Sequence, residues 1–396
     1  MAASGRTRAF AWLTRNTVLL ALASLFGDVS TEMLYPVLPA FLTQTLGASG
    51  SALGLVEGIA QAAQNIVQGF SGWLSDRLQR RKPVALVGYL LAAVAKPLIG
   101  LASSWQGVLG ARLLDRLGAG TRSAPRDTLI ASSVADEHRG KAFGLEGIGD
   151  NLGAFLGPLL AVFLLGYLGA EMRLIFLLAI VPGLIAFFMV ALVREPPAET
   201  ATPTKTEITL RYLPKAYWKY LLVIALFGLG NSSTSFLILQ TQAVGVSLDK
   251  TILIYAAFNF VAAVVSYPAG SLSDMLGRRM ILLVAFMIFF LTYLGFALTE
   301  NILVIALLFI LYGAFQGIFR SVGKALATDL VPERLRASGI GCYSATIGLL
   351  GLVASVVAGQ LWDHVGHAAV FLYGAVFAVV GGIALLVMLP ADAKVA

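Results

Sequence analysis

Ionisable side chains lie inside long apolar stretches of the first half of the sequence. They are Asp28, Glu32, Glu57, Lys96, Arg112, Asp115, Arg116, Glu146 and Asp150. A charged group at the centre of a bilayer costs at least ~2.5 kcal/mol, so such groups should face a polar cavity or pair with one another. Burial favours the neutral form of a carboxylic acid, and a buried acid can therefore bind and release a proton near neutral pH. The pattern predicts proton-carrying groups, ion pairs between helices, or both.

Two neighbouring carboxylates are the leading candidates for proton binding. Asp28 and Glu32 are four residues apart, so they share one face of a helix. Because like charges side by side hold helices together poorly, we expect both to carry coupling protons, with Lys96 or Arg116 competing for the deprotonated form.

The other acids are assigned in the same way. Glu146 and Asp150 share a stripe of another helix and join the proton-coupling candidates, with a structural role left open. Arg112 and Asp115 are three residues apart, which favours a structural ion pair on one helix.

Polar residues in other apolar stretches predict the wall of a substrate cavity. The first half supplies Glu57, Gln61, Asn65, Lys96 and Arg116. Residues 231–235 align with residues 28–32 and keep their polar character without either carboxylate. The second half should therefore form a neutral wall, with candidates Asn231, Gln240, Tyr255, Phe258 and Asn259.

Composition indicates that membrane helices position these residues. The chain is 58% hydrophobic and 12% charged, against about 25% charged in soluble domains. A spanning helix needs about 20 residues, and twelve stretches qualify, near 17–45, 49–74, 83–103, 105–131, 141–168, 173–193, 219–243, 251–273, 280–298, 302–326, 338–362 and 368–390. We predict an all-α membrane protein with bundles of six helices at 1–193 and 219–396, joined by a polar cytoplasmic linker at 194–218.

The distribution of basic residues predicts the orientation and excludes some partners. Lys and Arg gather at the termini, in the linker and in alternate loops, which places both termini in the cytoplasm. The net charge of +7 does not indicate a nucleic-acid partner, because it is spread over short loops. Cys342 is the only cysteine, so no intrachain disulfide can form. No cofactor is expected, and the composition suggests a bacterial inner membrane.

A basic loop motif occurs twice, half the chain length apart. Its first copy contains Gly72, Asp76, Arg77, Arg80 and Arg81, and its second copy contains Gly270, Asp274, Arg278 and Arg279. The aspartates can accept hydrogen bonds from arginines, so the loops could form a conformational latch. The alternative is simple anchoring of the loops by positive charge.

These loops resemble the first signature of the major facilitator superfamily. Two further segments resemble its helix-four signature and the helix-five signature associated with antiporters, at Arg112, Gly118 and Gly120 and at Gly149, Gly153, Gly157 and Pro158. Arg116 stands where the superfamily usually has glycine. The resemblance implies two six-helix bundles that rock about a central site, usually in a monomer.

The expected function is proton-coupled antiport that exports a small amphipathic or cationic compound. Acids outnumber bases among the ionisable residues counted above, which would attract a cation. One alternative cargo is a metal ion or metal chelate held by Asp28, Glu32 and Asp150. Another is an organic anion held by Lys96, Arg116 and Arg122. A non-transporting sensor or lipid-handling protein is the alternative of another class. An enzyme is not expected, because no nucleophile or phosphate-binding motif occurs.

Overall fold

The structure, a computed structural model, describes residues 13–78, 80–135, 138–195, 213–332 and 335–389. The side chains of residues 69, 72–78 and 336–338 also lie outside this description. The basic residues of the first twelve positions and most of the expected linker at 194–218 therefore fall outside the described residues.

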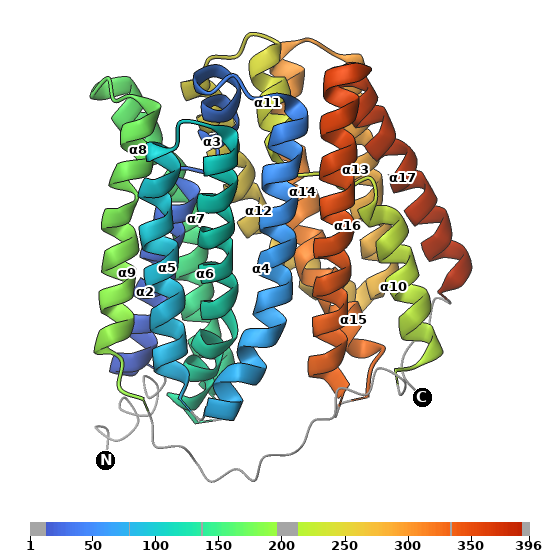
Figure 1. The fold of residues 1–396 in the computed structure, drawn as a ribbon. Coiled ribbons are helices and arrows are strands. Elements are labelled where there is room, and N and C mark those ends of the chain that lie inside the picture. Colours follow the sequence, from blue (N-terminus) through green and yellow to red (C-terminus); the bar gives the residue numbers. More distant parts are fainter. Residues whose placement is uncertain (1–12, 79, 136–137, 196–212, 333–334, 390–396) are drawn as a thin grey trace, which may run out of the picture. The chain divides into compact units, whose positions relative to one another are not determined.

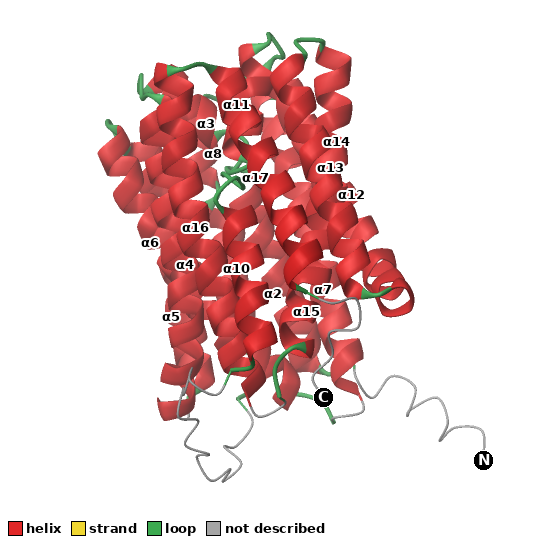
Figure 2. Ribbon diagram, turned by 90° about the vertical axis from the view of Figure 1, so that its right-hand side faces the viewer, coloured by secondary structure: helices red, strands yellow, loops and turns green. Residues whose placement is uncertain are grey.

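Each of the twelve apolar stretches is helical, and the described residues contain no strand (Figures 1 and 2). Eight of the described helices are long and apolar enough to cross a membrane. The prediction of an all-α membrane fold is confirmed. In chain order the helices are α2 (Arg15–Glu32), α3 (Leu38–Ala40), α4 (Gly50–Leu78), α5 (Arg81–Leu101), α6 (Trp105–Ser132), α7 (Arg139–Val162), α8 (Met172–Leu178), α9 (Ile180–Leu192), α10 (Lys215–Gly228), α11 (Ser235–Ala243), α12 (Leu248–Leu276), α13 (Arg278–Leu298), α14 (Ile302–Ile318), α15 (Lys324–Asp329), α16 (Arg336–His364) and α17 (His367–Met388).

The first and seventh apolar stretches are broken rather than continuous. In the first, α2 ends at Glu32 and α3 begins at Leu38, with Pro36 between them. Proline cannot donate to the helical ladder and disfavours the helical conformation of the residue before it. In the seventh, α10 ends at Gly228 and α11 begins at Ser235. The prediction of one continuous helix over 219–243 is therefore wrong, because residues 229–234 leave the regular helix.

Contacts divide the chain into two compact units, each described here by itself. The first unit comprises residues 1–35 and 66–204, and the second comprises residues 36–65 and 205–396. Residues 36–65 thus pack with the second half of the sequence. The division of the sequence into bundles at 1–193 and 219–396 stays a prediction.

Small residues bring the first half of α4 against α16 within the second unit. A Cβ atom on Gly58 would lie 3.1 Å from the Cα of Leu352, and one on Gly359 would lie 2.6 Å from the carbonyl oxygen of Gly50. Asp363 closes this contact by accepting hydrogen bonds from the backbone N–H groups of Gly50 and Ser51, each at 2.8 Å. The carboxylate therefore caps the N-terminus of α4, where unpaired N–H groups and the helix dipole favour negative charge.

Replacing Asp363 by alanine is expected to destabilise this contact. Loss of an N-terminal capping side chain costs about 0.5–2 kcal/mol, so the melting temperature of the purified protein should fall. The matched control is Glu300→Ala, because Glu300 is exposed and caps no helix. An equal melting temperature for Asp363→Ala and wild type would show that the cap is dispensable.

Candidate functional site

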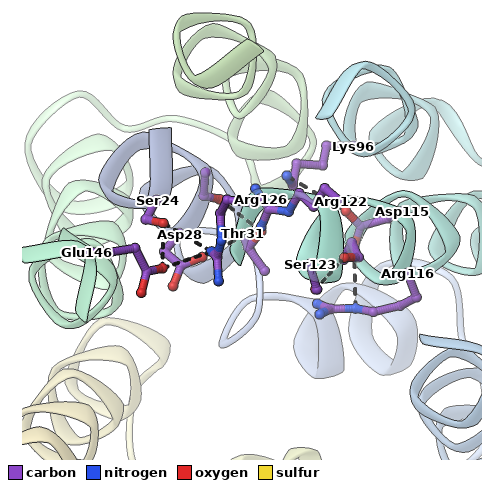
Figure 3. Close-up of polar contacts among 12 residues, drawn as sticks. Ser24, Asp28, Thr31, Lys96, Asp115, Arg116, Arg122, Ser123, Arg126 and Glu146 are labelled. Atoms are coloured by element: carbon purple, nitrogen blue, oxygen red, sulfur yellow. Dashed lines mark hydrogen bonds and ion pairs between the residues drawn. The ribbon is translucent and has the colours of Figure 1, made fainter. Parts of the chain in front are cut away.

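The ionisable residues of the first unit come from four helices that small residues hold close together. Helix α5 packs along α6, and a Cβ atom on Gly118 would lie 2.6 Å from the backbone nitrogen of Ala92. Glycine at this position lets two helix backbones approach where lipid offers no hydrophobic drive for association. This close approach places Lys96 of α5 beside Asp115 of α6 (Figure 3).

The glycine stripe of α7 sets that helix directly against the acidic face of α2. A Cβ atom on Gly153 would lie 2.8 Å from the Cβ of Asp28, and one on Gly157 would lie 3.0 Å from the Cβ of Glu32. Pro158, next to this stripe, is buried inside α7. The stripe that resembles the helix-five signature is thus the surface against which both α2 carboxylates lie.

Asp28 lies between a cation of α6 and an acid of α7. The Nη2 atom of Arg122 is 3.7 Å from the Oδ1 atom of Asp28 (Figure 3). On its other side, Asp28 interacts side chain to side chain with Asp150, and Glu32 is a further neighbouring charge. Arg122 is thus the cation paired with Asp28, while Lys96 has a weaker charge interaction with it. Competition from Lys96 or Arg116 stays a prediction.

Asp115 forms ion pairs with three basic side chains. Its carboxylate lies 3.0 Å from Nη1 of Arg112, 3.4 Å from Nε of Arg116 and 3.7 Å from Nζ of Lys96. The ion pair expected between Arg112 and Asp115 is present. The side chain of Asp115 is 1% exposed, whereas that of Asp28 is 21% exposed. Of these two carboxylates, therefore, Asp28 is the one that water can reach.

Glu146 belongs to a third group of contacts. It lies 2.9 Å from Nη1 of Arg126 and accepts a hydrogen bond of 2.7 Å from the hydroxyl of Ser24. Arg126 also donates to Ser24 at 3.0 Å (Figure 3). It pairs with Asp127 at 3.0 Å as well. These contacts join α2, α6 and α7 and give Glu146 a structural ion pair.

Sequence reasoning missed Arg126 and considered Arg122 only as part of an anion site. Both residues lie near the end of the apolar stretch at 105–131, and they are four residues apart, so they share one face of α6. Adding them to the count leaves six acids against five bases. The charge argument for a cationic cargo is therefore weaker than the first count indicated.

Replacing Glu146 by glutamine is expected to lower stability. The variant removes one acidic partner of the half-buried Arg126 and leaves Asp127 and the more distant charge of Asp150. Loss of a charged hydrogen-bond partner costs about 1–3 kcal/mol. The melting temperature should fall, while the proton release described below should persist because Asp28 is unchanged. The matched control is Glu171→Gln, at an exposed glutamate. Loss of proton release in a folded Glu146→Gln variant would instead give Glu146 a coupling role.

The remaining cavity candidates lie in the second unit. Glu57 is buried, Gln61 is exposed, and Asn65 packs against Gly348 of α16. Gln240 is buried and lines a cavity of about 420 Å³ together with Phe296, Thr299, Glu300 and His367.

An aromatic row runs through α12 and α14 of the same unit. Tyr255 stacks on Phe258 with ring centres 5.4 Å apart, and Phe258 stacks on Tyr312 at 5.7 Å. Asn231 lies at the break between α10 and α11 and contacts Tyr312. Asn259 follows Phe258 on α12 and has contacts of its own.

The structure describes the side chains of the second basic loop but only part of the first. In the second copy, Arg278 pairs with Asp274 at 3.2 Å and also with Asp329 at the end of α15. Arg279 donates a hydrogen bond of 2.7 Å to the carbonyl oxygen of Leu386. A Cβ atom on Gly270 would have no other group within 4 Å. These contacts tie the loop to α15 and α17 within the second unit.

In the first copy, Gly72, Asp76 and Arg77 lie on α4, where the side chains fall outside the described residues. Arg80 is exposed and precedes α5, and the backbone N–H of Arg81 donates to Glu195 at 2.5 Å. The preceding turn of α4 is anchored by Ser71, which donates to the carbonyl oxygen of Gly120 at 3.0 Å.

A metal cargo receives no support from the described residues. In these ranges, no group of three or more His, Cys, Asp or Glu side chains is placed to hold a metal ion.

Comparison with known proteins places this architecture in a family. A family model, described as Major Facilitator Superfamily, matches residues 20–241 and 220–396. The chain belongs to the Major Facilitator Superfamily. As a facilitator it is a multi-pass integral membrane transporter, and its cargo is a small molecule.

Individual relatives of this facilitator span nearly its whole length. An uncharacterized MFS-type transporter of Methanocaldococcus jannaschii is 34% identical over 380 residues, covering 94% of this chain and 95% of the relative. The quinolone resistance protein NorA of Staphylococcus aureus is 24% identical over 355 residues, covering 84% and 86%. The crystal structure of a mutant of the nucleoside transporter NupG matches with a TM-score of 0.82 at 14% identity, covering 94% of this chain and all of that one.

Proposed function

We propose that this facilitator is a proton-coupled antiporter that exports a small amphipathic compound, with Asp28 as its principal proton carrier. The observation that carries the proposal is the position of Asp28 between Arg122 and Asp150. Two carboxyl groups in contact favour one shared proton, because adjacent negative charges disfavour ionisation of both. Arg122 favours the opposite state, in which Asp28 is ionised.

Asp28 therefore has neighbours that favour opposite protonation states. In one state it holds a proton and faces Asp150, and in the other it is ionised and paired with Arg122. The separation of 3.7 Å from Arg122 is longer than a tight charged hydrogen bond of 2.7–2.9 Å. A pair held this loosely can exchange, and the exposed fraction of Asp28 gives water or cargo access to it.

Two other groups of charged residues have close partners, and we assign them a structural role. We assign Asp115 with its three cations to the structural core of the first unit, and Glu146 with Arg126 to the same role. Glu32 and Asp150 are assigned to coupling together with Asp28, because both are neighbouring charges of that residue. A protonated or paired site leaves little net charge for cargo, which favours an amphipathic compound over a strongly charged one.

Alternating access requires contacts that break between states. We propose that the Asp363 cap of α4 is one such contact and that the Arg278–Asp274 loop is another. The quinolone resistance relative supports export of drug-like compounds. The proposed setting is a monomer in a bacterial inner membrane, with both termini in the cytoplasm and no nucleic-acid partner.

The proposal is tested by uptake into proteoliposomes that contain the purified wild-type protein. Vesicles with an acidic lumen should accumulate amphipathic fluorescent dyes from the outside as protons leave. The accumulation should disappear when a protonophore removes the pH gradient or when the protein is omitted. Protein-dependent uptake that is unchanged by the protonophore would overturn proton coupling and leave uniport.

A further inference from the structure

The break between α10 and α11 brings three polar side chains of the second unit together. Asn231 lies in the break, and Tyr312 and Gln316 are one helical turn apart on α14. Residues four apart on a helix share one face, so both α14 side chains are available to Asn231 at the same point. None of the three is ionisable near neutral pH.

The hydrogen bonds among these side chains have a defined direction. Gln316 donates from Nε2 to the phenol oxygen of Tyr312 at 3.2 Å, and the phenol donates to Oδ1 of Asn231 at 3.4 Å. Thr234 forms a further hydrogen bond with the same phenol. Tyr312 itself is fully buried, and Tyr293 is a further hydrogen-bonding neighbour of its hydroxyl.

This chain of bonds leaves a donor and an acceptor free. The amide nitrogen of Asn231 and the amide oxygen of Gln316 have no protein partner in the part of the chain that the structure describes. Both side chains are half-buried rather than enclosed. Because both amides bond to one phenol, a free N–H donor and a free C=O acceptor both belong to side chains that surround Tyr312.

We infer that this pair is a cargo subsite that binds the edge of a neutral cyclic amide, such as a lactam, an imide or a nucleobase edge. The N–H groups of Asn231 would donate to the carbonyl oxygen of the compound, and Oε1 of Gln316 would accept its N–H. The aromatic row of Tyr312, Phe258 and Tyr255 beside the amides suits a flat compound. The inference rests on the proposed transport function, and it names the class of cargo.

The subsite should reject analogues that lack the N–H. A half-buried acceptor left without a partner on binding weakens affinity by about ten-fold or more. Sites built to hydrogen-bond a cargo group discriminate in this way, whereas apolar pockets do not. A difference in affinity between an amide and its isosteric ester therefore distinguishes this subsite from an apolar cavity without hydrogen-bonding groups.

The experiment measures the dissociation constants of 2-quinolone, N-methyl-2-quinolone and coumarin with the purified full-length protein. These probes share a flat bicyclic frame and a carbonyl, but only 2-quinolone has the N–H. Wild type should bind 2-quinolone about ten-fold more tightly than the other two. Equal constants for the three probes, or no measurable binding of 2-quinolone, would overturn the inference.

Two variants locate the effect within the pair. Gln316→Met should weaken 2-quinolone to the level of coumarin and leave coumarin unchanged, whereas Asn231→Leu should weaken both probes equally. The matched control is Gln360→Met at an exposed glutamine of α16, which should keep the wild-type preference. A preference that survives Gln316→Met would overturn the inference. Because binding is measured without a proton gradient, failure here is distinct from failure of proton coupling.

Discussion

Replacing Asp28 by asparagine is expected to abolish transport driven by a proton gradient while leaving the fold intact. Asparagine has the shape of aspartate but cannot carry a proton, so the exchange between the protonated state and the Arg122-paired state is lost. Dye accumulation in acidic-lumen vesicles should fall to the level of vesicles without protein. The melting temperature should change little, because Asp28 is partly exposed and its contact with Arg122 is long.

The matched control for this prediction is Asp249→Asn. Asp249 is an exposed aspartate in the first turn of α12, far along the chain from the acidic face of α2. The control should transport like wild type. Gradient-driven accumulation by Asp28→Asn at the wild-type rate would contradict the assignment of Asp28. Glu32 and Asp150 would then remain as the candidate proton carriers.

The second large effect is expected from Gly153→Leu on α7. A Cβ atom at this position would lie 2.8 Å from the Cβ of Asp28 and would also crowd the backbone of α2. Leucine therefore cannot be accommodated unless α7 moves away from α2. Overpacking of this kind costs about 1–3 kcal/mol, and the movement would also separate Asp150 from Asp28. We expect a lower melting temperature together with loss of gradient-driven transport.

Gly147→Leu is the matched control on the same helix. A Cβ atom on Gly147 would meet no other group within 4 Å, so leucine has room there. This variant should keep both the melting temperature and the transport of wild type. If both variants behave alike, the close approach of α7 to α2 is not what positions the acids.

The helices themselves could be predicted because apolar length is a local property of the sequence. The break at Pro36 has a local cause, and proline marks it. The break at 229–234 contains no proline, and its polar residues 231–234 were interpreted as a cavity wall rather than as an interruption of the helix. Its position became informative only when it was seen beside Tyr312 of α14.

The ion-pair partners of charged residues on different helices could not be predicted from the sequence. The spacing of Arg112 and Asp115 indicates a pair because both lie on one helix. The contact between Asp28 and Arg122 joins α2 to α6, and it depends on how glycine stripes let these helices approach. Arg122 and Arg126 could have been noticed from their i, i+4 spacing.

The packing of residues 36–65 with the second half of the sequence is another contact that could not be predicted from the sequence. The glycines at positions 50, 54 and 58 recur every four residues on α4, a pattern that indicates close packing. The pattern does not name the partner helix. Only the structure shows that α16 receives this face and that Asp363 caps it.

The central claim is that Asp28 releases a proton when cargo binds, and proton release tests it most directly. The purified protein is kept in weakly buffered detergent with a pH-sensitive dye, and a panel of amphipathic compounds is added. Wild type should release protons on binding a compound, and Asp28→Asn should bind the same compound without releasing them. Equal proton release from wild type and Asp28→Asn would contradict the account.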